Sequence, residues 1–198
     1  MIKAIIFDYG GVLSAEASLS SFGAIYAPKF GKNPEDFNKL IFENWDHARV
    51  NNINSKLFWK NLANFIEIDP NSLRKDFMDF FGFREEVFEL IKKIKKNRYK
   101  LGLLSNQIED WLEEIIENHK LNQTFDAIVT SYKSKIAKPD ISIFKEIVEK
   151  LNVKPTECIY IDDMDKNIPP AKQLGMKTIL FRDNKQLIKE LKDLGVKI

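Results

Sequence analysis

Five short runs of apolar residues, each of strand length, recur along the chain with amphipathic stretches between them. The runs are Lys3 to Asp8, Tyr99 to Ser105, Asp126 to Ser131, Cys158 to Asp162 and Lys177 to Phe181. Between them, apolar side chains recur at helical spacing, as in Val87, Phe88, Ile91 and Ile94. Near-continuous apolar strands that alternate with helices indicate a parallel sheet covered on both faces. The sequence therefore predicts an α/β, doubly wound, Rossmann-like fold with a parallel five-stranded sheet.

Residues 14–83 break this alternation, because they carry helical patterns and no convincing strand pattern. One helical face is formed by Phe37, Leu40 and Ile41, and another by Leu57, Phe58, Leu62, Phe65 and Ile66. Prolines at 28, 34 and 70 punctuate the segment. We predict two domains, an α/β core of residues 1–13 and 84–198 and a small inserted helical cap of residues 14–83.

Composition excludes several classes of partner. The chain has 198 residues, and its 31 basic and 29 acidic side chains leave a formal charge of +2, which provides no strong field for nucleic acid or anionic lipid. No apolar run reaches membrane-spanning length, and the N-terminal run is too short for a signal peptide. The single cysteine, Cys158, lies in an apolar run and suits a reducing compartment. We expect a cytoplasmic protein without a nucleic-acid or membrane partner, and the sequence leaves its oligomeric state open.

Polar residues follow three of the predicted strands. Asp8 ends the first strand, Ser105 and Asn106 follow the second, and Asp162 and Asp163 follow the fourth. In open α/β sheets, ligands bind outside the carboxyl ends of the strands, so these side chains are expected to meet at one rim. A further candidate precedes the proline in the sequence Lys-Pro-Asp at 138–140, where the ring would restrict the turn.

These groups together suit the chemistry of a phosphate ester. A carboxylate such as Asp8 can attack phosphorus and form an aspartyl-phosphate. That attack needs positive charge and hydrogen-bond donors, which Lys138, Ser105 and a magnesium ion held by carboxylates would supply. Hard oxygen ligands favour Mg²⁺, and the chain has no His/Cys ligand spacing for zinc.

Four motifs in this order resemble those of the haloacid dehalogenase superfamily over nearly the whole chain. They are Asp8-Tyr9-Gly10-Gly11-Val12-Leu13, Leu104-Ser105-Asn106, Lys138-Pro139-Asp140 and Ile161-Asp162-Asp163-Met164-Asp165-Lys166-Asn167. The chain is similar to the branch with a small helical C1 cap that includes the phosphatase domain of soluble epoxide hydrolase and glucose-1-phosphate phosphatases. The resemblance implies strand order 5-4-1-2-3 and a C1 cap at residues 14–83.

The resemblance also implies a reaction and a set of site residues. The expected activity is Mg²⁺-dependent hydrolysis of a small phosphorylated metabolite, such as a sugar phosphate. Asp8 would be the nucleophile, and Ser105, Asn106 and Lys138 would bind the phosphoryl group. The metal ligands would be Asp8, the Gly10 carbonyl, Asp162 and Asp163.

One position departs from the phosphatase pattern. Phosphatases of this superfamily usually carry a second aspartate two residues after the nucleophile, as general acid and base, and here that residue is Gly10. General acid catalysis contributes typically ~10²–10⁴-fold, so esters with poor leaving groups should react slowly. The rates for acyl, anomeric or aryl phosphates would be lowered less, because their leaving groups are better. Phosphatases of the glucose-1-phosphate type resemble this chain in having glycine there.

Several alternatives stay open at the level of the sequence. Asp8, Asp162 and Ser105-Asn106 can each serve as a helix cap. Asn167 either supports the metal site or is an ordinary polar residue of the first helical turn. In the cap, His47 or Arg49 can be proposed to reach the leaving group. The alternative functions are a catalytically impaired binding or regulatory protein, which rests on Gly10, and a metal-free 2-haloacid dehalogenase, which the Asp162-Asp163 pair disfavours.

Overall fold

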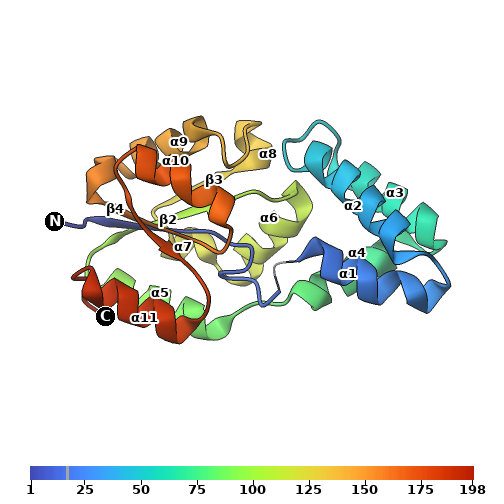
Figure 1. Cartoon of the computed structure of the whole chain (residues 1–198), viewed down its shortest axis with the longest axis horizontal. Helices are drawn as coiled ribbons and strands as arrows, with labels where there is room; N and C mark the ends of the chain where they lie inside the picture. The colour runs from blue at the N-terminus through green and yellow to red at the C-terminus, as the bar shows by residue number, and fades with distance from the viewer. Residues whose placement is uncertain (17) are drawn as a thin grey trace.

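A computed structural model describes residues 1–16 and 18–198 (Figure 1). Its five parallel strands form one sheet in the order β3-β2-β1-β4-β5. The strands are β1 (Ala4–Phe7), β2 (Lys100–Ser105), β3 (Ala127–Thr130), β4 (Cys158–Asp162) and β5 (Lys177–Leu180). Read from the other edge, this is the order 5-4-1-2-3, so the fold class and the strand order are both confirmed.

Helices cover both faces of the sheet. Figure 1 shows α9 and α10 on one side and α5 and α11 on the other. Beyond the cap, the helices are α5 (Glu85–Lys96), α6 (Glu109–Asn118), α7 (Leu121–Thr124), α8 (Ser131–Ser134), α9 (Ile141–Leu151), η2 (Pro155–Glu157), η3 (Asp165–Asn167), α10 (Ile168–Gln173) and α11 (Asn184–Asp193). This two-sided cover explains why the strands are apolar on both faces.

Side chains of each strand alternate between two hydrophobic cores. In β1, Ala4 and Ile6 pack in the core beneath α9 and α10, whereas Ile5 and Phe7 pack in the core on the other face. The second core is continuous with the buried aromatic residues of the helices between β1 and α5. Cys158 is buried in the first core, as the apolar run around it predicts.

The segment between β1 and α5 is helical, as predicted. Its helices are α1 (Leu19–Tyr26), η1 (Ala27–Phe30), α2 (Pro34–Ala48), α3 (Ser55–Ile66) and α4 (Pro70–Phe81). We call these the cap helices, and Figure 1 places them together beyond one end of the sheet. Asn33 and Asp69 accept hydrogen bonds from main-chain N–H groups of the first turns of α2 and α4, each followed by a proline at the first helical position. The boundaries of two domains at 13/14 and 83/84 stay a prediction.

The two chain segments that connect the cap helices to the sheet lie side by side. The main-chain N–H of Arg84 donates to the carbonyl of Leu13 at 2.7 Å. The guanidinium of Arg84 donates to the carbonyls of Ser14 at 3.3 Å and Ala15 at 2.9 Å. One arginine therefore ties the outgoing connection to the returning one, next to the end of β1.

Within residues 1–16 and 18–198, none of the helices combines the length and the apolar character that crossing a bilayer requires.

Candidate active site

The carboxyl ends of the three central strands carry the polar residues that the sequence singled out. Asp8 follows β1 directly and is held there because its main-chain N–H donates to the carbonyl of Ile161 in β4 at 2.9 Å. Ser105 and Asp162 are the last residues of β2 and β4. The parallel sheet thus brings the three side chains to one rim, as predicted. All three are buried there.

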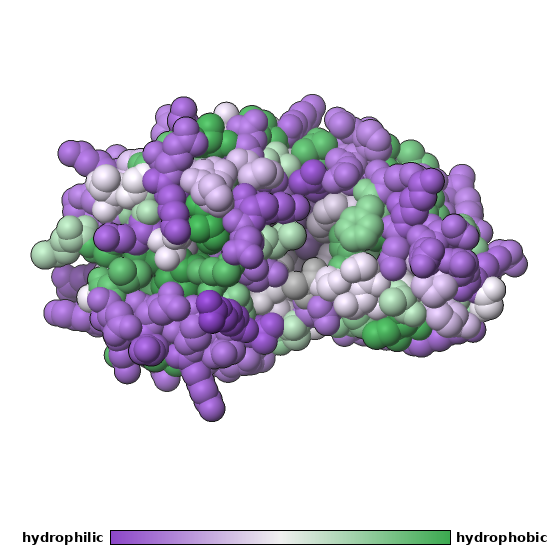
Figure 2. All heavy atoms as spheres, viewed as in Figure 1, coloured by the Kyte–Doolittle hydropathy of each residue, from purple (hydrophilic) through white to green (hydrophobic). Residues whose placement is uncertain are grey.

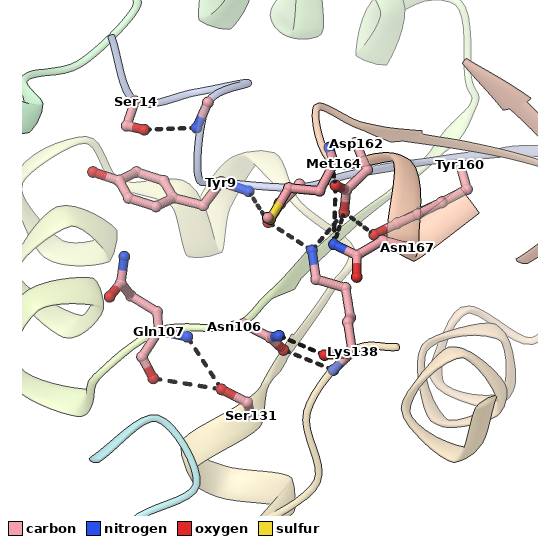
Figure 3. Close-up of polar contacts among 12 residues, drawn as sticks. Tyr9, Ser14, Asn106, Gln107, Ser131, Lys138, Tyr160, Asp162, Met164 and Asn167 are labelled. Atoms are coloured by element: carbon pink, nitrogen blue, oxygen red, sulfur yellow. Dashed lines mark hydrogen bonds and ion pairs between the residues drawn. The ribbon is translucent and has the colours of Figure 1, made fainter. Parts of the chain in front are cut away.

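Lys138 enters this rim from the loop that precedes α9 (Figure 3). The side-chain amide of Asn106 donates to the Lys138 carbonyl at 2.9 Å and accepts from its N–H at 2.8 Å. The Lys138 ammonium then lies 2.9 Å from Asp8 Oδ1 and 2.7 Å from Asp162 Oδ2. Asn106 therefore positions Lys138 through its main chain, and a direct contact of Asn106 with phosphate stays a prediction.

The carboxylate of Asp162 is surrounded by donors besides Lys138. The Tyr160 hydroxyl donates to its Oδ2, and the main-chain N–H of Met164 donates to its Oδ1 at 2.8 Å (Figure 3). The Asn167 amide nitrogen lies 3.0 Å from both of its oxygens. The sequence leaves Asn167 as either a support of the metal site or an ordinary polar residue, and in the structure it orients the carboxylate that holds Lys138.

Charges in this cluster do not balance. Oxygens of Asp8, Asp162 and Asp163 come within 4.8 Å of one another, and Lys138 is the cation that bridges the first two. Three carboxylates against one ammonium leave an excess of two negative charges when all are ionised.

The pKa values reflect this excess. Burial raises the pKa of Asp8 well above its usual value, although Lys138 opposes the rise. Burial and the neighbouring Asp162 carboxylate raise the pKa of Asp163 to about 6. Burial alone would lower the pKa of Lys138, but the carboxylates of Asp162 and Asp8 outweigh it and raise that pKa. Although burial opposes it, Lys138 lowers the pKa of Asp162. The Lys138 ammonium and the Asp162 carboxylate are therefore held in their charged forms, while Asp8 and Asp163 lack sufficient positive charge.

A divalent cation fits this donor set. It would offset two negative charges, and carboxylate and carbonyl oxygens are the ligands that Mg²⁺ prefers. Asp8, Gly10 and Asp163 all line the adjoining cavity, whereas Asp162 lies behind them with both oxygens already accepting hydrogen bonds. The three residues that line the cavity are thus better placed than Asp162 to hold a metal ion, and coordination by Asp162 stays a prediction.

A cavity of about 680 Å³ opens from this rim toward the cap helices. The lining from the sheet side includes Asp8, Lys138 and Asp163, and the lining from the cap includes Trp45 of α2 and Arg49, which directly follows α2. Figure 2 shows the hollow between the two parts of the molecule. A substrate bound at Lys138 would therefore extend between the strand ends and the cap helices.

The two cap residues proposed to reach a leaving group differ in their placement. Arg49 lines the cavity and is paired with Asp46 at 2.9 Å. His47 is exposed and is not among the described residues that line the cavity. The geometry thus supports Arg49 alone as a neighbour of a bound substrate.

Sequence analysis missed several residues of this site. Tyr160 lies on an apolar strand, where its alternation reads as core, yet its hydroxyl reaches Asp162. Gln107, which directly follows the Ser105-Asn106 motif, is buried and lines the cavity. Trp111 on α6 and Trp45 on α2 have helical spacing and read as core residues, but both line the cavity. Only Gln107 carried a signal in the sequence, namely its position directly after a motif.

A family profile described as haloacid dehalogenase-like hydrolase matches residues 5–181. The match includes all five strands, the cap helices and the acidic rim. The chain therefore belongs to the haloacid dehalogenase-like hydrolase family.

Curated relatives are similar to part of the chain. The bifunctional epoxide hydrolase 2 of Rattus norvegicus is 30% identical over 105 residues, which is 50% of this chain and 18% of that protein. The flavin mononucleotide hydrolase 1 of Arabidopsis thaliana is 26% identical over 132 residues, 67% of this chain and 54% of that protein. Pyrophosphatase PpaX of Bacillus mycoides is 30% identical over 95 residues, 48% of this chain and 44% of that protein. The chain thus spans only part of the length of each of these relatives.

Solved structures share the fold over almost the whole chain. A HAD family enzyme of Bacteroides thetaiotaomicron superposes with a TM-score of 0.79 at 22% identity, covering 94% of this chain and 98% of that one. The same enzyme, in complex with magnesium and inorganic phosphate, superposes with a TM-score of 0.77 at 24% identity and covers 94% and 99% of the two chains. An L-2-haloacid dehalogenase of Xanthobacter autotrophicus superposes with a TM-score of 0.63 at 19% identity, covering 100% of this chain and 85% of that one.

Proposed function

We propose that this hydrolase is a Mg²⁺-dependent phosphohydrolase that acts on a small phosphorylated metabolite through an aspartyl-phosphate on Asp8. The observation that carries the proposal is the buried rim in which Lys138 bridges Asp8 and Asp162 while Asp163 faces the cavity. A phosphoryl group needs a nucleophile, a fixed cation and a metal, and this rim supplies the residues for all three.

In the first step, an Asp8 oxygen attacks phosphorus, a P–O bond to Asp8 forms, and the ester P–O bond breaks with its electron pair on the leaving oxygen. The Lys138 ammonium lies 2.9 Å from Asp8 Oδ1, so it is placed to orient the attacking carboxylate and to offset charge on the phosphoryl oxygens. Asp162 and Asn106 keep this ammonium in place. In the second step, water attacks phosphorus of the aspartyl-phosphate, which releases inorganic phosphate and regenerates Asp8.

Ser105 provides a further donor. Its buried hydroxyl at the end of β2 has no hydrogen-bond partner among the residues that the structure describes. A buried hydroxyl without a partner is costly, and a phosphoryl oxygen would satisfy it. A bound Mg²⁺ ion, held by Asp8, the Gly10 carbonyl and Asp163, would supply the remaining positive charge.

The relatives support phosphoryl chemistry. The similar proteins include a flavin mononucleotide hydrolase and a pyrophosphatase, and a structural neighbour was solved with magnesium and inorganic phosphate. Against a metal-free dehalogenase stands the excess of carboxylates, because Asp163 would add uncompensated negative charge to a site without a cation. Against a purely regulatory protein stands the retention of nucleophile, lysine and acidic rim together.

The test is phosphate release from acetyl phosphate, sugar phosphates and p-nitrophenyl phosphate, with Mg²⁺ and with EDTA. Wild type should turn over at least one of these substrates only with Mg²⁺, and Asp8→Asn should abolish turnover while the variant stays folded. Release of halide from a 2-haloacid in EDTA would instead establish the dehalogenase. Absence of turnover in a folded protein that binds Mg²⁺ would favour the binding or regulatory protein.

A further inference from the structure

Three aromatic side chains contribute to the cavity lining, the partly exposed Trp45 and, behind it, the buried Trp111 and Phe81. Trp45 from α2, Trp111 from α6 and Phe81 at the end of α4 all line the cavity. The Trp111 ring centroid lies 6.1 Å from that of Trp45 and 4.8 Å from that of Phe81. We call these three residues the aromatic wall.

The aromatic wall is connected to the nucleophile through one residue. Tyr9 directly follows Asp8, and its ring packs edge-on against Trp111 with centroids 6.1 Å apart. A group that leaves from a phosphorus atom bound at Asp8 and extends into the cavity would therefore enter beside this wall. Aromatic rings gain stacking and edge contacts on such a surface beyond the burial of their area.

Two exposed apolar side chains also contribute to the cavity lining, next to charged residues. Phe42 from α2 and Met164 from the loop after β4 both line the cavity, and each is 45% exposed. Exposed large apolar side chains that line a cavity are covered when an apolar ligand occupies it. Phe42 and Met164 thus add apolar contact area for such a ligand.

The missing acid adds an independent chemical constraint. Gly10 offers no side chain that could protonate the leaving oxygen, so a leaving group that is stable as an anion is favoured. The pKa of a phenolic hydroxyl is roughly 10, whereas an aliphatic alcohol resembles water, with a pKa of about 15.7. A phenolate is therefore a far better unassisted leaving group than an alkoxide.

We propose that the substrate is an aryl phosphate, a phosphomonoester of a phenolic hydroxyl, whose ring lies against the aromatic wall. This proposal rests on the proposed phosphohydrolase function and specifies its substrate class. The Asp8 carboxylate displaces the aryl oxygen, the P–O bond to that oxygen breaks, and the phenolate takes up a proton from water. Hydrolysis of the aspartyl-phosphate then yields inorganic phosphate, so one ester and one water give one phenol and one phosphate.

Four substrates separate the requirement for an aromatic ring from the requirement for a good leaving group. Phenyl phosphate has an aromatic ring and a good leaving group, benzyl phosphate has the ring with an alkoxide, acetyl phosphate has a good leaving group without a ring, and ethyl phosphate has neither. We expect kcat for phenyl phosphate to exceed that for benzyl phosphate by ~10²-fold or more, because the acid is absent. Ethyl phosphate should be the poorest of the four.

Substitutions then test the aromatic surface. Trp45→Leu and Phe42→Ala should each lower kcat/KM for phenyl phosphate by roughly two- to tenfold, mainly through KM, since aromatic contacts are worth ~0.5–1.5 kcal/mol. Acetyl phosphate should be hydrolysed by both variants within about twofold of wild type. The matched control is Leu57→Ala on α3, where a side chain of similar exposure, 41%, is not among the described residues that line the cavity.

Each result decides one level of the proposal. If acetyl phosphate is hydrolysed but benzyl and phenyl phosphate react at equal rates, or if neither cap variant affects phenyl phosphate selectively, the aryl phosphate proposal is wrong and the phosphohydrolase stands. If wild type hydrolyses sugar phosphates but none of these four, the aryl phosphate proposal is wrong and the phosphohydrolase stands. If wild type hydrolyses neither these four nor the sugar phosphates, the proposed function itself is wrong. Should Trp45→Leu fail to fold, Phe42→Ala decides alone, because its side chain is largely at the surface.

Discussion

Gly10 leaves space in the site where a side chain could stand. An added Cβ at this position would meet no heavy atom within 4 Å among the described residues, and the backbone there is not in the left-handed region that disfavours other amino acids. Both facts mean that neither steric crowding nor backbone strain demands a glycine. The absence of a general acid is thus a chemical property of the site that one substitution can reverse.

We predict that Gly10→Asp raises kcat for a poor leaving group such as benzyl phosphate by ten- to a hundredfold, because a carboxyl group would protonate the departing alkoxide. The rate with phenyl phosphate should change by less than about threefold. Steady-state phosphate release measures both. Gly10→Asn is the matched control, since it has the same shape and no acidic proton, and equal gains in both variants would contradict general acid catalysis.

At the scale of single residues, the motifs and their positions predicted which residues form the acidic rim, but not how these residues contact one another. The sequence placed Asp8 and Asp162 at strand ends and Lys138 in a turn before a helix, and the structure joins them by ion pairs. Helical spacing allows Asn167 and Asp163 to face a metal together, and in the structure Asn167 donates to Asp162, where η3 forms the turn after β4. Sequence spacing alone does not predict that contact.

At the scale of elements, α6 is the main polar link between the core and the cap helices. The Asp110 carboxylate near its start accepts from the Trp59 indole N–H of α3 at 2.7 Å and from Arg74 Nε of α4 at 2.8 Å. Arg74 also donates to Glu114, one turn further along α6, at 2.6 Å. Trp111 continues the contact in the interior, where its ring packs 5.1 Å from that of Phe77. The aromatic wall contains residues of both α6 and the cap helices. Its shape therefore depends on how the cap helices pack against α6.

We predict that Asp110→Ala lowers the free energy of unfolding by about 1.5–3 kcal/mol, because it removes the acceptor for two donors, one of them charged. Chemical denaturation followed by fluorescence measures the change. The matched control is Asp79→Ala, which breaks an exposed ion pair with Lys75 and should cost less than about 1 kcal/mol. Equal losses in the two variants would show that the α6 contact has no special role.

Helical periodicity predicted α2 and α3, but neither α1 nor α4. The structure shows that prolines preceded by capping residues begin α2 and α4. By contrast, α1 is an eight-residue helix with a glycine in its interior, which weakens a local signal. An added Cβ at Gly23 would come within 2.0 Å of Asn38 Oδ1, so the glycine allows α1 to approach α2 closely. Such a helix is stabilised by its tertiary contacts, which no periodicity reveals.

At the scale of the whole molecule, a chain of formal charge +2 concentrates negative charge at one buried rim. The strand order brings the residues of this rim together. It could be predicted from the family resemblance, but not from the pattern of any single strand. The continuity of the second core with the cap helices depends on contacts such as Trp111 with Phe77, which are distant in sequence and not encoded in local patterning. Assembly of the site therefore depends on the complete fold, and a metal that binds the rim should stabilise all of it.

We predict that MgCl₂ raises the Tm of the wild-type protein. At a concentration a hundredfold above its Kd, the ion adds about 2.7 kcal/mol, which for a chain of this size corresponds to roughly 5–10 °C. Asp163→Asn should abolish most of this shift. Asp165→Asn is the matched control, because Asp165 lines the cavity but is exposed and is not part of the acidic cluster. An identical shift in wild type and Asp163→Asn would place the metal elsewhere.

The most direct measurement is to locate the covalent intermediate. Wild type mixed with acetyl phosphate and Mg²⁺, quenched in acid within the first turnovers and digested, should yield the peptide containing Asp8 with the added mass of one phosphoryl group. This added mass should be absent when EDTA replaces Mg²⁺ and when Asp8→Asn replaces the wild type. A label on another residue, or sustained Mg²⁺-dependent turnover by Asp8→Asn, would contradict nucleophilic catalysis by Asp8.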